Sequence, residues 1–173
     1  MNIGLILCNG FEDIEALATK DILNRAGVNV IIYGDNNIVS SNHNTKIIVD
    51  KLIDASILNL DGIILPGGLP GAYNLRNHKE LNNYIHKLYE NNKLITAICA
   101  APIVLKDINE KKTVYPDNEF IDVIKDNYVD EDVVISNNVI TAKGPALTFD
   151  FAFAILDYFK IEYNDIKKGM LFK

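Results

Sequence analysis

The sequence predicts an α/β fold with a mostly parallel central sheet. Short apolar runs of strand length alternate with segments of helical spacing, which is the pattern of βαβ units. The chain of 173 residues is long enough to form one full hydrophobic core. It contains no internal repeat, low-complexity tract or interdomain linker. We therefore expect a single domain over residues 1–173.

The first half of the chain predicts three strands and one long helix. The helix carries an apolar stripe and ends at Gly27, because glycine commonly follows the last helical residue. An asparagine-rich segment with many turn signals predicts a small β-excursion. In order, these elements are a strand over 2–7, a helix over 12–26, a strand over 28–33, the excursion over 35–50 and a strand over 61–65.

The second half continues the alternation and ends with an unusually apolar helix. Pro102 suits the first turn of a short helix, where its missing N–H costs nothing. A polar, acidic region separates this short helix from the last strand. In order, the predicted elements are a helix over 79–91, a strand over 94–98, the short helix from 102, strand-like pieces near 113–114 and 133–135, a strand over 139–142 and a helix over 147–159.

Composition argues against several classes of partner. The net charge is −6 and no Lys/Arg cluster occurs, so we expect no nucleic-acid partner. No apolar run approaches the roughly 20 residues that cross a bilayer, and no basic leader precedes the first strand, so we expect no membrane partner. The two cysteines end different predicted strands, which favours a reducing cytoplasm over a disulfide framework. The three scattered histidines show no ligand spacing, so we expect no metal.

Cys99 lies where an apolar run ends and small residues follow. The pattern predicts a strand, a sharp turn and then a helix, with the cysteine at the corner. At that corner the positive end of the following helix would favour the reactive thiolate over the thiol. The alternative is a cysteine that only packs, since free cysteine is among the most buried residue types. Cys8, inside the first apolar run, fits that alternative.

Three features follow the carboxyl ends of predicted parallel strands, where open α/β sheets bind ligands. They are an acidic segment that includes Glu15, the pair Gly67 and Gly68, and Cys99. Glu15 has the spacing of the apolar helix face, and a buried acid needs a partner or a proton. The two glycines suit a simple turn, but they also let backbone N–H groups approach a substrate oxygen. We expect the three segments to meet in one small pocket.

Five motifs follow one another along the chain. They are Asn9-Gly10-Phe11-Glu12-Asp13-Ile14-Glu15-Ala16, Leu23-Asn24-Arg25-Ala26-Gly27, Leu65-Pro66-Gly67-Gly68-Leu69-Pro70-Gly71-Ala72, Ala97-Ile98-Cys99-Ala100-Ala101-Pro102 and Thr141-Ala142-Lys143-Gly144-Pro145. With these motifs the chain resembles the ThiJ/PfpI superfamily, in the branch of the parkinsonism-associated deglycase (DJ-one) and its bacterial relatives. The resemblance covers essentially the whole chain in order.

The resemblance implies a flavodoxin-like three-layer sandwich, a homodimer and a site that needs no cofactor. It places the nucleophile at Cys99 and its acidic partner at Glu15, and in relatives this acid is protonated and hydrogen-bonds the thiolate. Two adjacent anions repel, so such a pair shares one proton. The resemblance also assigns the oxyanion donors to the backbone N–H groups of Gly68 and Ala100. The pocket residues that it adds are Gly67, Tyr115, Arg25 and Pro145.

Two positions depart from the family pattern. Tyr115 precedes Pro116 where many relatives have His-Pro, and tyrosine is a poor general base at neutral pH. The segment around His43 stands where relatives often carry an arginine, and we expect His43 to be an exposed loop residue. The usual pocket histidine and arginine are therefore both replaced.

Two functions follow from the resemblance. The first is a cysteine-dependent glyoxalase or deglycase acting on methylglyoxal or on glyoxal adducts of protein side chains. The second is a non-enzymatic redox sensor or stress chaperone that uses an oxidisable Cys99. Ala100 follows the cysteine where the peptidase branch has a histidine, and the last third of the chain has no histidine for an amidotransferase triad.

Overall fold

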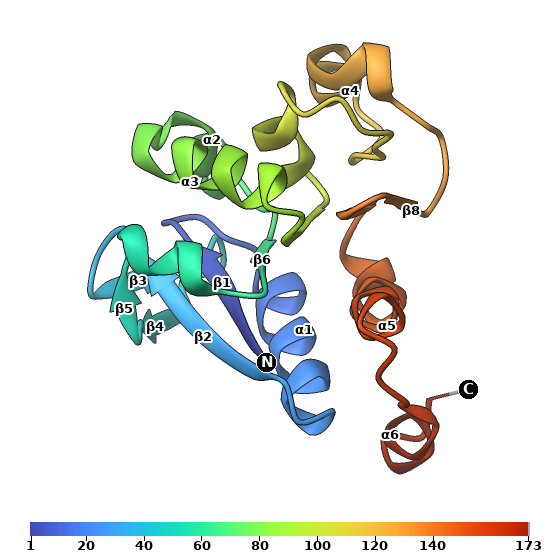
Figure 1. Ribbon diagram of the computed structural model, residues 1–173. Helices are drawn as coiled ribbons and strands as arrows, with labels where there is room; N and C mark the ends of the chain where they lie inside the picture. The colour runs from blue at the N-terminus through green and yellow to red at the C-terminus, as the bar shows by residue number, and fades with distance from the viewer. Residues whose placement is uncertain (173) are drawn as a thin grey trace.

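The computed structural model describes residues 1–172 and confirms the predicted α/β class. The described residues form nine strands and ten helices. Figure 1 shows their arrangement in space. The strands are β1 (Asn2–Leu7), β2 (Asn29–Gly34), β3 (Ile38–Ser40), β4 (Lys46–Ile48), β5 (Lys51–Leu52), β6 (Gly62–Leu65), β7 (Leu94–Ile98), β8 (Val133–Ser136) and β9 (Val139–Ala142).

The helices are of two kinds. The α-helices are α1 (Asp13–Arg25), α2 (Gly71–Asn77), α3 (Lys79–Glu90), α4 (Asn118–Ile124), α5 (Thr148–Tyr158) and α6 (Asn164–Gly169). The 3₁₀ helices are η1 (Ala55–Asn59), η2 (Ala101–Leu105), η3 (Lys125–Asn127) and η4 (Pro145–Leu147). In the part of the chain that the structure describes, no helix is long and apolar enough to span a bilayer.

Seven strands form one sheet in the order β5-β2-β1-β6-β7-β9-β8. Every neighbouring pair is parallel except β8 with β9. Without the two edge strands, the order is β2-β1-β6-β7-β9, which is the flavodoxin-like arrangement. The direction of winding reverses between β1 and β6, and this is the position where such sheets bind ligands.

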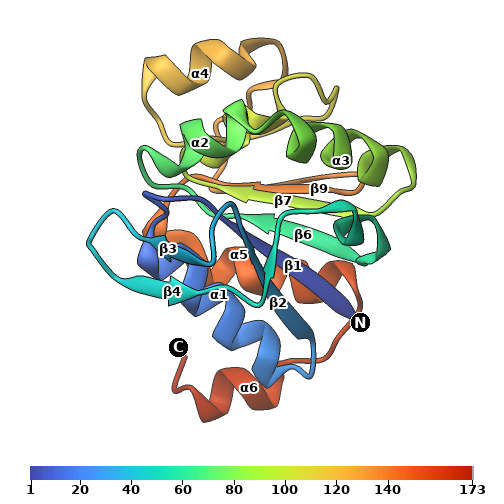
Figure 2. The same cartoon turned by 90° about the vertical axis from the view of Figure 1, so that its left-hand side faces the viewer.

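Helices cover both faces of the sheet and make the sandwich three-layered. Figure 2 shows α1, α5 and α6 on one side and α2, α3 and α4 on the other. The central strands are therefore buried on both faces, and all five residues of β7 are buried. A separate apolar core fills each side, and the partly buried Cys99 packs against both.

The sequence predicts the main strands within a few residues, and the differences from the prediction lie in the polar regions. The predicted excursion is an antiparallel hairpin of β3 and β4. Residues 113–114 form no strand, because the Thr113 N–H donates to the Thr141 side chain (2.9 Å) rather than to a strand ladder. The short helix expected from Pro102 is the 3₁₀ helix η2. The sequence analysis missed α2, α4, α6 and β5.

Candidate functional site

The carboxyl ends of β1, β6 and β7 lie side by side at one edge of the sheet. These strands are neighbours in parallel register, so the segments that follow them converge. The segment after β1 leads to Glu15, the segment after β6 contains Gly67 and Gly68, and Cys99 follows β7 directly. The convergence expected from the sequence is therefore present, at the reversal point of the sheet.

Cys99 sits in a strained turn between β7 and η2. Its φ of 61° lies in the left-handed region, which a side chain with a Cβ adopts at a cost of about 1–2 kcal/mol. Two backbone hydrogen bonds hold this conformation: the Cys99 N–H donates to Ala142 O (2.9 Å), and the Tyr115 N–H donates to Cys99 O (2.8 Å). Neighbouring loops therefore fix the backbone that carries the thiol.

Glu15 lies in the first turn of α1 and is fully buried. Its Oε2 accepts a 2.7 Å hydrogen bond from the Gly67 N–H. Its own N–H donates to Glu12 Oε2 (2.8 Å), so Glu12 caps the helix as its place at the start of α1 predicts. Glu15 Oε1 has no hydrogen-bond partner of ordinary geometry among the described residues. One carboxylate oxygen is thus anchored, and the other is free for chemistry.

Gly67 allows Glu15 and Cys99 to meet. A Cβ on Gly67 would lie 2.8 Å from Cys99 Cβ and 2.8 Å from Glu15 Oε2, closer than real Cβ contacts allow. The Gly67 carbonyl also accepts from the Glu12 N–H (3.0 Å), which ties the start of α1 to the loop after β6. The sequence analysis gave Gly67 only a general place in the pocket.

Gly68 and Ala100 present backbone N–H groups to the Cys99 sulfur. Gly68 has a φ of 87°, and a Cβ there would lie 2.6 Å from Glu12 N, so glycine is required by both strain and space. Ala100 is buried directly after the cysteine. These are the two donors that the sequence analysis assigned to an oxyanion site.

Burial controls the protonation of the pair. It raises the pKa of Glu15 to about 7, although the Gly67 N–H and the Cys99 side chain favour the carboxylate. Burial and then the charge of Glu15 raise the pKa of the Cys99 thiol far above its ordinary value, against the lowering effect of the Ala100 and Gly68 N–H groups.

The thiolate expected at Cys99 stays a prediction, because the two groups are coupled. The element after Cys99 is the short helix η2, and the Ala100 N–H at its start lowers the pKa of the thiol while burial raises it. Near neutral pH, Cys99 and Glu15 together hold one proton for which both groups compete. Cys8 packs in the core, as expected, and burial raises the pKa of its thiol to about 12.

Tyr115 and Pro145 line a hollow beside the backbone of Cys99. The hollow has a volume of about 220 Å³ and is formed by Tyr115, Pro116 and residues 143–147. The Tyr115 ring is partly exposed and packs edge-to-face on Phe120, with centroids 6.4 Å apart. These two predicted pocket residues therefore share one surface.

Arg25 lies away from this group within the chain. It occupies the last turn of α1, the opposite end of the helix from Glu15, and pairs with Asp21 through a 2.7 Å ion pair. Both side chains are about half exposed. The structure does not bring Arg25 to Cys99, so the role in the pocket that the resemblance implies is not supported within one chain.

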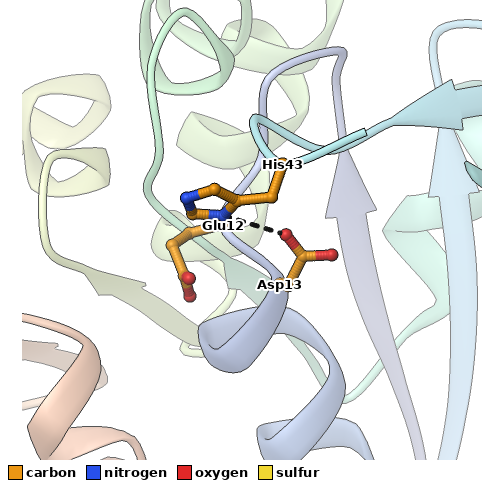
Figure 3. A group of neighbouring side chains, drawn as sticks. All are labelled: Glu12, Asp13 and His43. Carbon is orange, nitrogen blue, oxygen red and sulfur yellow. Dashed lines mark hydrogen bonds and ion pairs between the residues drawn. The ribbon is translucent and has the colours of Figure 1, made fainter. Parts of the chain in front are cut away.

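A second group of side chains lies at the start of α1, and the sequence analysis missed it. Figure 3 shows Glu12 and Asp13 beside His43, which comes from the loop between β3 and β4. The His43 Nδ1 lies 3.3 Å from Asp13 Oδ2. His43 is exposed, as predicted, but 30 residues separate it from its partner, so no spacing rule reveals the contact.

Comparison with known proteins places the chain in a family. An Arabidopsis thaliana protein, DJ-1 homolog B, is 33% identical over 162 residues, which cover 88% of this chain and only 36% of the longer plant protein. The structure of Drosophila melanogaster DJ-1beta superposes with a TM-score of 0.89 at 29% identity, covering 98% of this chain and 97% of that one. Oxidized Toxoplasma gondii DJ-1 superposes with a TM-score of 0.87 at 30% identity, with the same two coverages.

The family model gives the assignment directly. The model of the DJ-1/PfpI family matches residues 1–158, which include every strand and the whole Cys99 site. The order of the motifs, the sheet topology and the structural matches agree with it. The chain belongs to the DJ-1/PfpI family.

Proposed function

We propose that the protein is a cysteine-dependent, cofactor-free enzyme of the glyoxalase or deglycase type, acting on methylglyoxal or on glyoxal adducts of side chains. One observation carries the proposal: the buried carboxyl of Glu15 adjoins Cys99, anchored through Oε2 and unpaired at Oε1. This arrangement supplies a nucleophile, a proton acceptor and backbone donors in one place. Membership of the chain in the DJ-1/PfpI family supports the same class of chemistry.

The first step is attack of the Cys99 sulfur on the aldehyde carbon of methylglyoxal. Glu15 takes the thiol proton as the carbon–sulfur bond forms. The carbonyl oxygen gains the electron pair of its π bond, and the Gly68 and Ala100 N–H groups stabilise the developing charge. Glu15 then gives the thiol proton to this oxygen and becomes a carboxylate again. The product is a hemithioacetal.

The second step moves hydrogen between the two carbons. Glu15 removes the proton from the former aldehyde carbon and passes it to the neighbouring carbonyl oxygen, which gives an enediol. Glu15 then takes the proton from the hydroxyl on the sulfur-bearing carbon and delivers it to the neighbouring carbon. The result is a thioester of lactate on Cys99, and water then releases lactate and restores the thiol. No electrons are lost or gained overall, so the reaction needs no external oxidant or reductant.

The raised pKa of Glu15 suits this work. A general base is most effective when its pKa lies near the operating pH, and burial raises the pKa of Glu15 to about 7. A phenol is a weak base, so Tyr115 does not supply a second one. We therefore assign proton transfer to Glu15 alone and give Tyr115 a place in the wall of the hollow.

The test is lactate formation from methylglyoxal by the purified protein. We expect Cys99→Ser to abolish turnover and Glu15→Gln to lower kcat by about 100-fold or more, since glutamine accepts the Gly67 hydrogen bond but takes no proton. Release of amines from glyoxal-modified peptides, measured on the same variants, tests the deglycase form. Lactate formation that survives Cys99→Ser would refute the proposal.

The second candidate is a redox sensor or stress chaperone, and the different burial of the two cysteines favours it. Cys99 is partly exposed, whereas Cys8 is 1% exposed. Mild peroxide should therefore add two oxygens to Cys99 alone, detected by intact mass and peptide mapping. Oxidation of Cys8 in preference to Cys99, or no oxidation at all, would remove this candidate.

We also propose a cytoplasmic homodimer. The family resemblance implies the dimer, and Ile38 and Ile48, which are exposed and paired across the hairpin of β3 and β4, offer apolar area for it. Both cysteines are unpaired, as expected in a reducing compartment. Sedimentation of the purified protein tests the dimer, and a monomer at micromolar concentration would contradict it.

A further inference from the structure

We propose that Glu12, Asp13 and His43 form a binding site for a divalent transition-metal ion, of which zinc is the representative. The site lies at the entry to α1, next to the Cys99 site but built from other side chains (Figure 3). One ligand atom from each of the three residues lies within 4.8 Å of the other two. The inference concerns binding and does not depend on the proposed enzyme activity.

The spacing of two of the ligand atoms already suits a metal. Atoms held about 2.1 Å from a tetrahedral zinc ion lie about 3.4 Å from one another. The His43 Nδ1 and Asp13 Oδ2 are 3.3 Å apart. Glu12 Oε2 accepts the Glu15 N–H, which leaves its other carboxylate oxygen to complete the set. Small side-chain rotations then bring three ligands to one ion, with a fourth position for water.

The negative charge of this group lacks a permanent cation. Glu12 is 8% exposed, and no lysine, arginine or histidine among the described residues forms an ion pair with it. Asp13 Oδ1 is buried without a hydrogen-bond partner within residues 1–172, while the side chains of His43, Ser41 and Thr45 surround the rest of the carboxylate. A buried carboxylate oxygen without a partner is costly, and a divalent cation would satisfy Asp13 Oδ1 and offset the charge of Glu12 at once.

The loop that carries His43 is held in place before any ion binds. The Asn42 N–H donates to Phe11 O (2.9 Å), and Phe11 forms a parallel bridge with Ser41. The Ser41 hydroxyl accepts from the His43 N–H (3.2 Å), which fixes the turn locally. The backbone of His43 is therefore fixed beside Glu12 and Asp13, and only its exposed ring needs to adjust.

The donor set selects the class of ion. One imidazole nitrogen with two carboxylates suits zinc and its transition-metal neighbours, whereas calcium and magnesium prefer oxygen ligands alone and in greater number. The positive end of α1 opposes any cation there, and the two carboxylates must outweigh it. We therefore expect a transition metal to bind and magnesium to compete poorly.

The test is calorimetric titration of the purified protein with zinc, in the presence of excess magnesium. We expect one zinc ion per chain, and His43→Ala or Asp13→Asn should weaken binding by about tenfold or more. His86→Ala is the matched control, because His86 is also exposed but lies on α3. The His43 side chain is 69% exposed, so its removal leaves the core intact, and circular dichroism checks this.

Cys99→Ser separates this site from the cysteine, which is itself a zinc ligand in many proteins. Binding should be unchanged in Cys99→Ser and in His86→Ala. Absence of zinc binding to the unmodified chain, equal affinity in His43→Ala, or loss of binding in Cys99→Ser would each overturn the proposal. None of these results depends on whether methylglyoxal is a substrate.

Discussion

The Gly67 N–H donates a 2.7 Å hydrogen bond to Glu15 Oε2, across 52 residues of sequence. This contact joins the loop after β6 to the first turn of α1 and fixes the buried carboxyl beside Cys99. It also removes the need for a charged partner, since a backbone dipole anchors the acid while burial raises its pKa to about 7. The proposed chemistry depends on this geometry.

Gly67→Ala should disable the site. The new Cβ would lie 2.8 Å from both Cys99 Cβ and Glu15 Oε2, so the two groups must move apart. We expect a loss of activity of about 100-fold or more and a destabilisation of about 1–3 kcal/mol. Gly169→Ala is the control, because a Cβ there meets no atom within 4 Å. Comparable activity in Gly67→Ala and Gly169→Ala would show that activity does not require the close approach of Glu15 to Cys99.

The pH dependence of kcat/KM should show an acid limb near pH 7. Glu15 can accept the thiol proton only as a carboxylate. That state forms when Glu15 and Cys99 together have lost the first of their two protons. Activity should therefore rise as the pH passes through about 7. The residual activity of Glu15→Gln should lack this limb. A chelator in every assay removes any metal ion bound at Glu12, Asp13 and His43. A profile that is flat from pH 6 to 8 in the unmodified enzyme would contradict the role of Glu15.

Glu15→Gln should stabilise the fold at alkaline pH. Burial raises the pKa of Glu15 from 4.5 to about 7, so the folded chain binds more protons than the unfolded chain between these values. The contribution of this group to stability is complete below pH 4.5 and is lost as the pH rises through 7. The loss amounts to about 3 kcal/mol. Urea unfolding of both proteins at pH 5 and pH 8.5, with chelator, measures the difference, which should be larger at pH 8.5. An equal difference in the free energy of unfolding at pH 5 and at pH 8.5 would mean that folding does not raise the pKa of Glu15.

Tyr115→His should raise activity. Tyr115 is partly exposed at the hollow beside the Cys99 backbone, so the substitution leaves the core unchanged. A histidine there titrates near neutral pH and adds a second group for proton transfer, with a gain in kcat/KM of up to about 100-fold. Phenylalanine at the same position is the control for size. Equal rates for histidine, tyrosine and phenylalanine would show that this position takes no part in proton transfer.

The sequence predicts the frame of the site well, because strand ends obey local rules. Apolar runs mark β1, β6 and β7, and parallel strands bring their carboxyl ends to one edge, so the segments of Cys99 and Glu15 could be placed in one pocket in advance. The pairing of the two side chains came from the family resemblance. The helices α2, α4 and α6 were missed because they have at most seven residues, too few to show a clear period.

The features that the sequence does not reveal are matters of distance and burial. The need for glycine at position 67 appears only when Cys99 and Glu15 flank it in space. The burial that raises the pKa of the Cys99 thiol depends on the whole fold, whereas the field of the next helix is local. The proximity of His43 to Asp13 likewise requires the folded β3–β4 loop.

The most direct measurement is the rate of lactate formation from methylglyoxal by the unmodified protein, by Cys99→Ser and by Cys8→Ser. Cys8 is the matched control, since it is equally unpaired but fully inside the core. We predict turnover by the unmodified protein and by Cys8→Ser, and none by Cys99→Ser. No lactate from the unmodified protein, or an equal rate after Cys99→Ser, would contradict the assignment of Cys99 as the nucleophile.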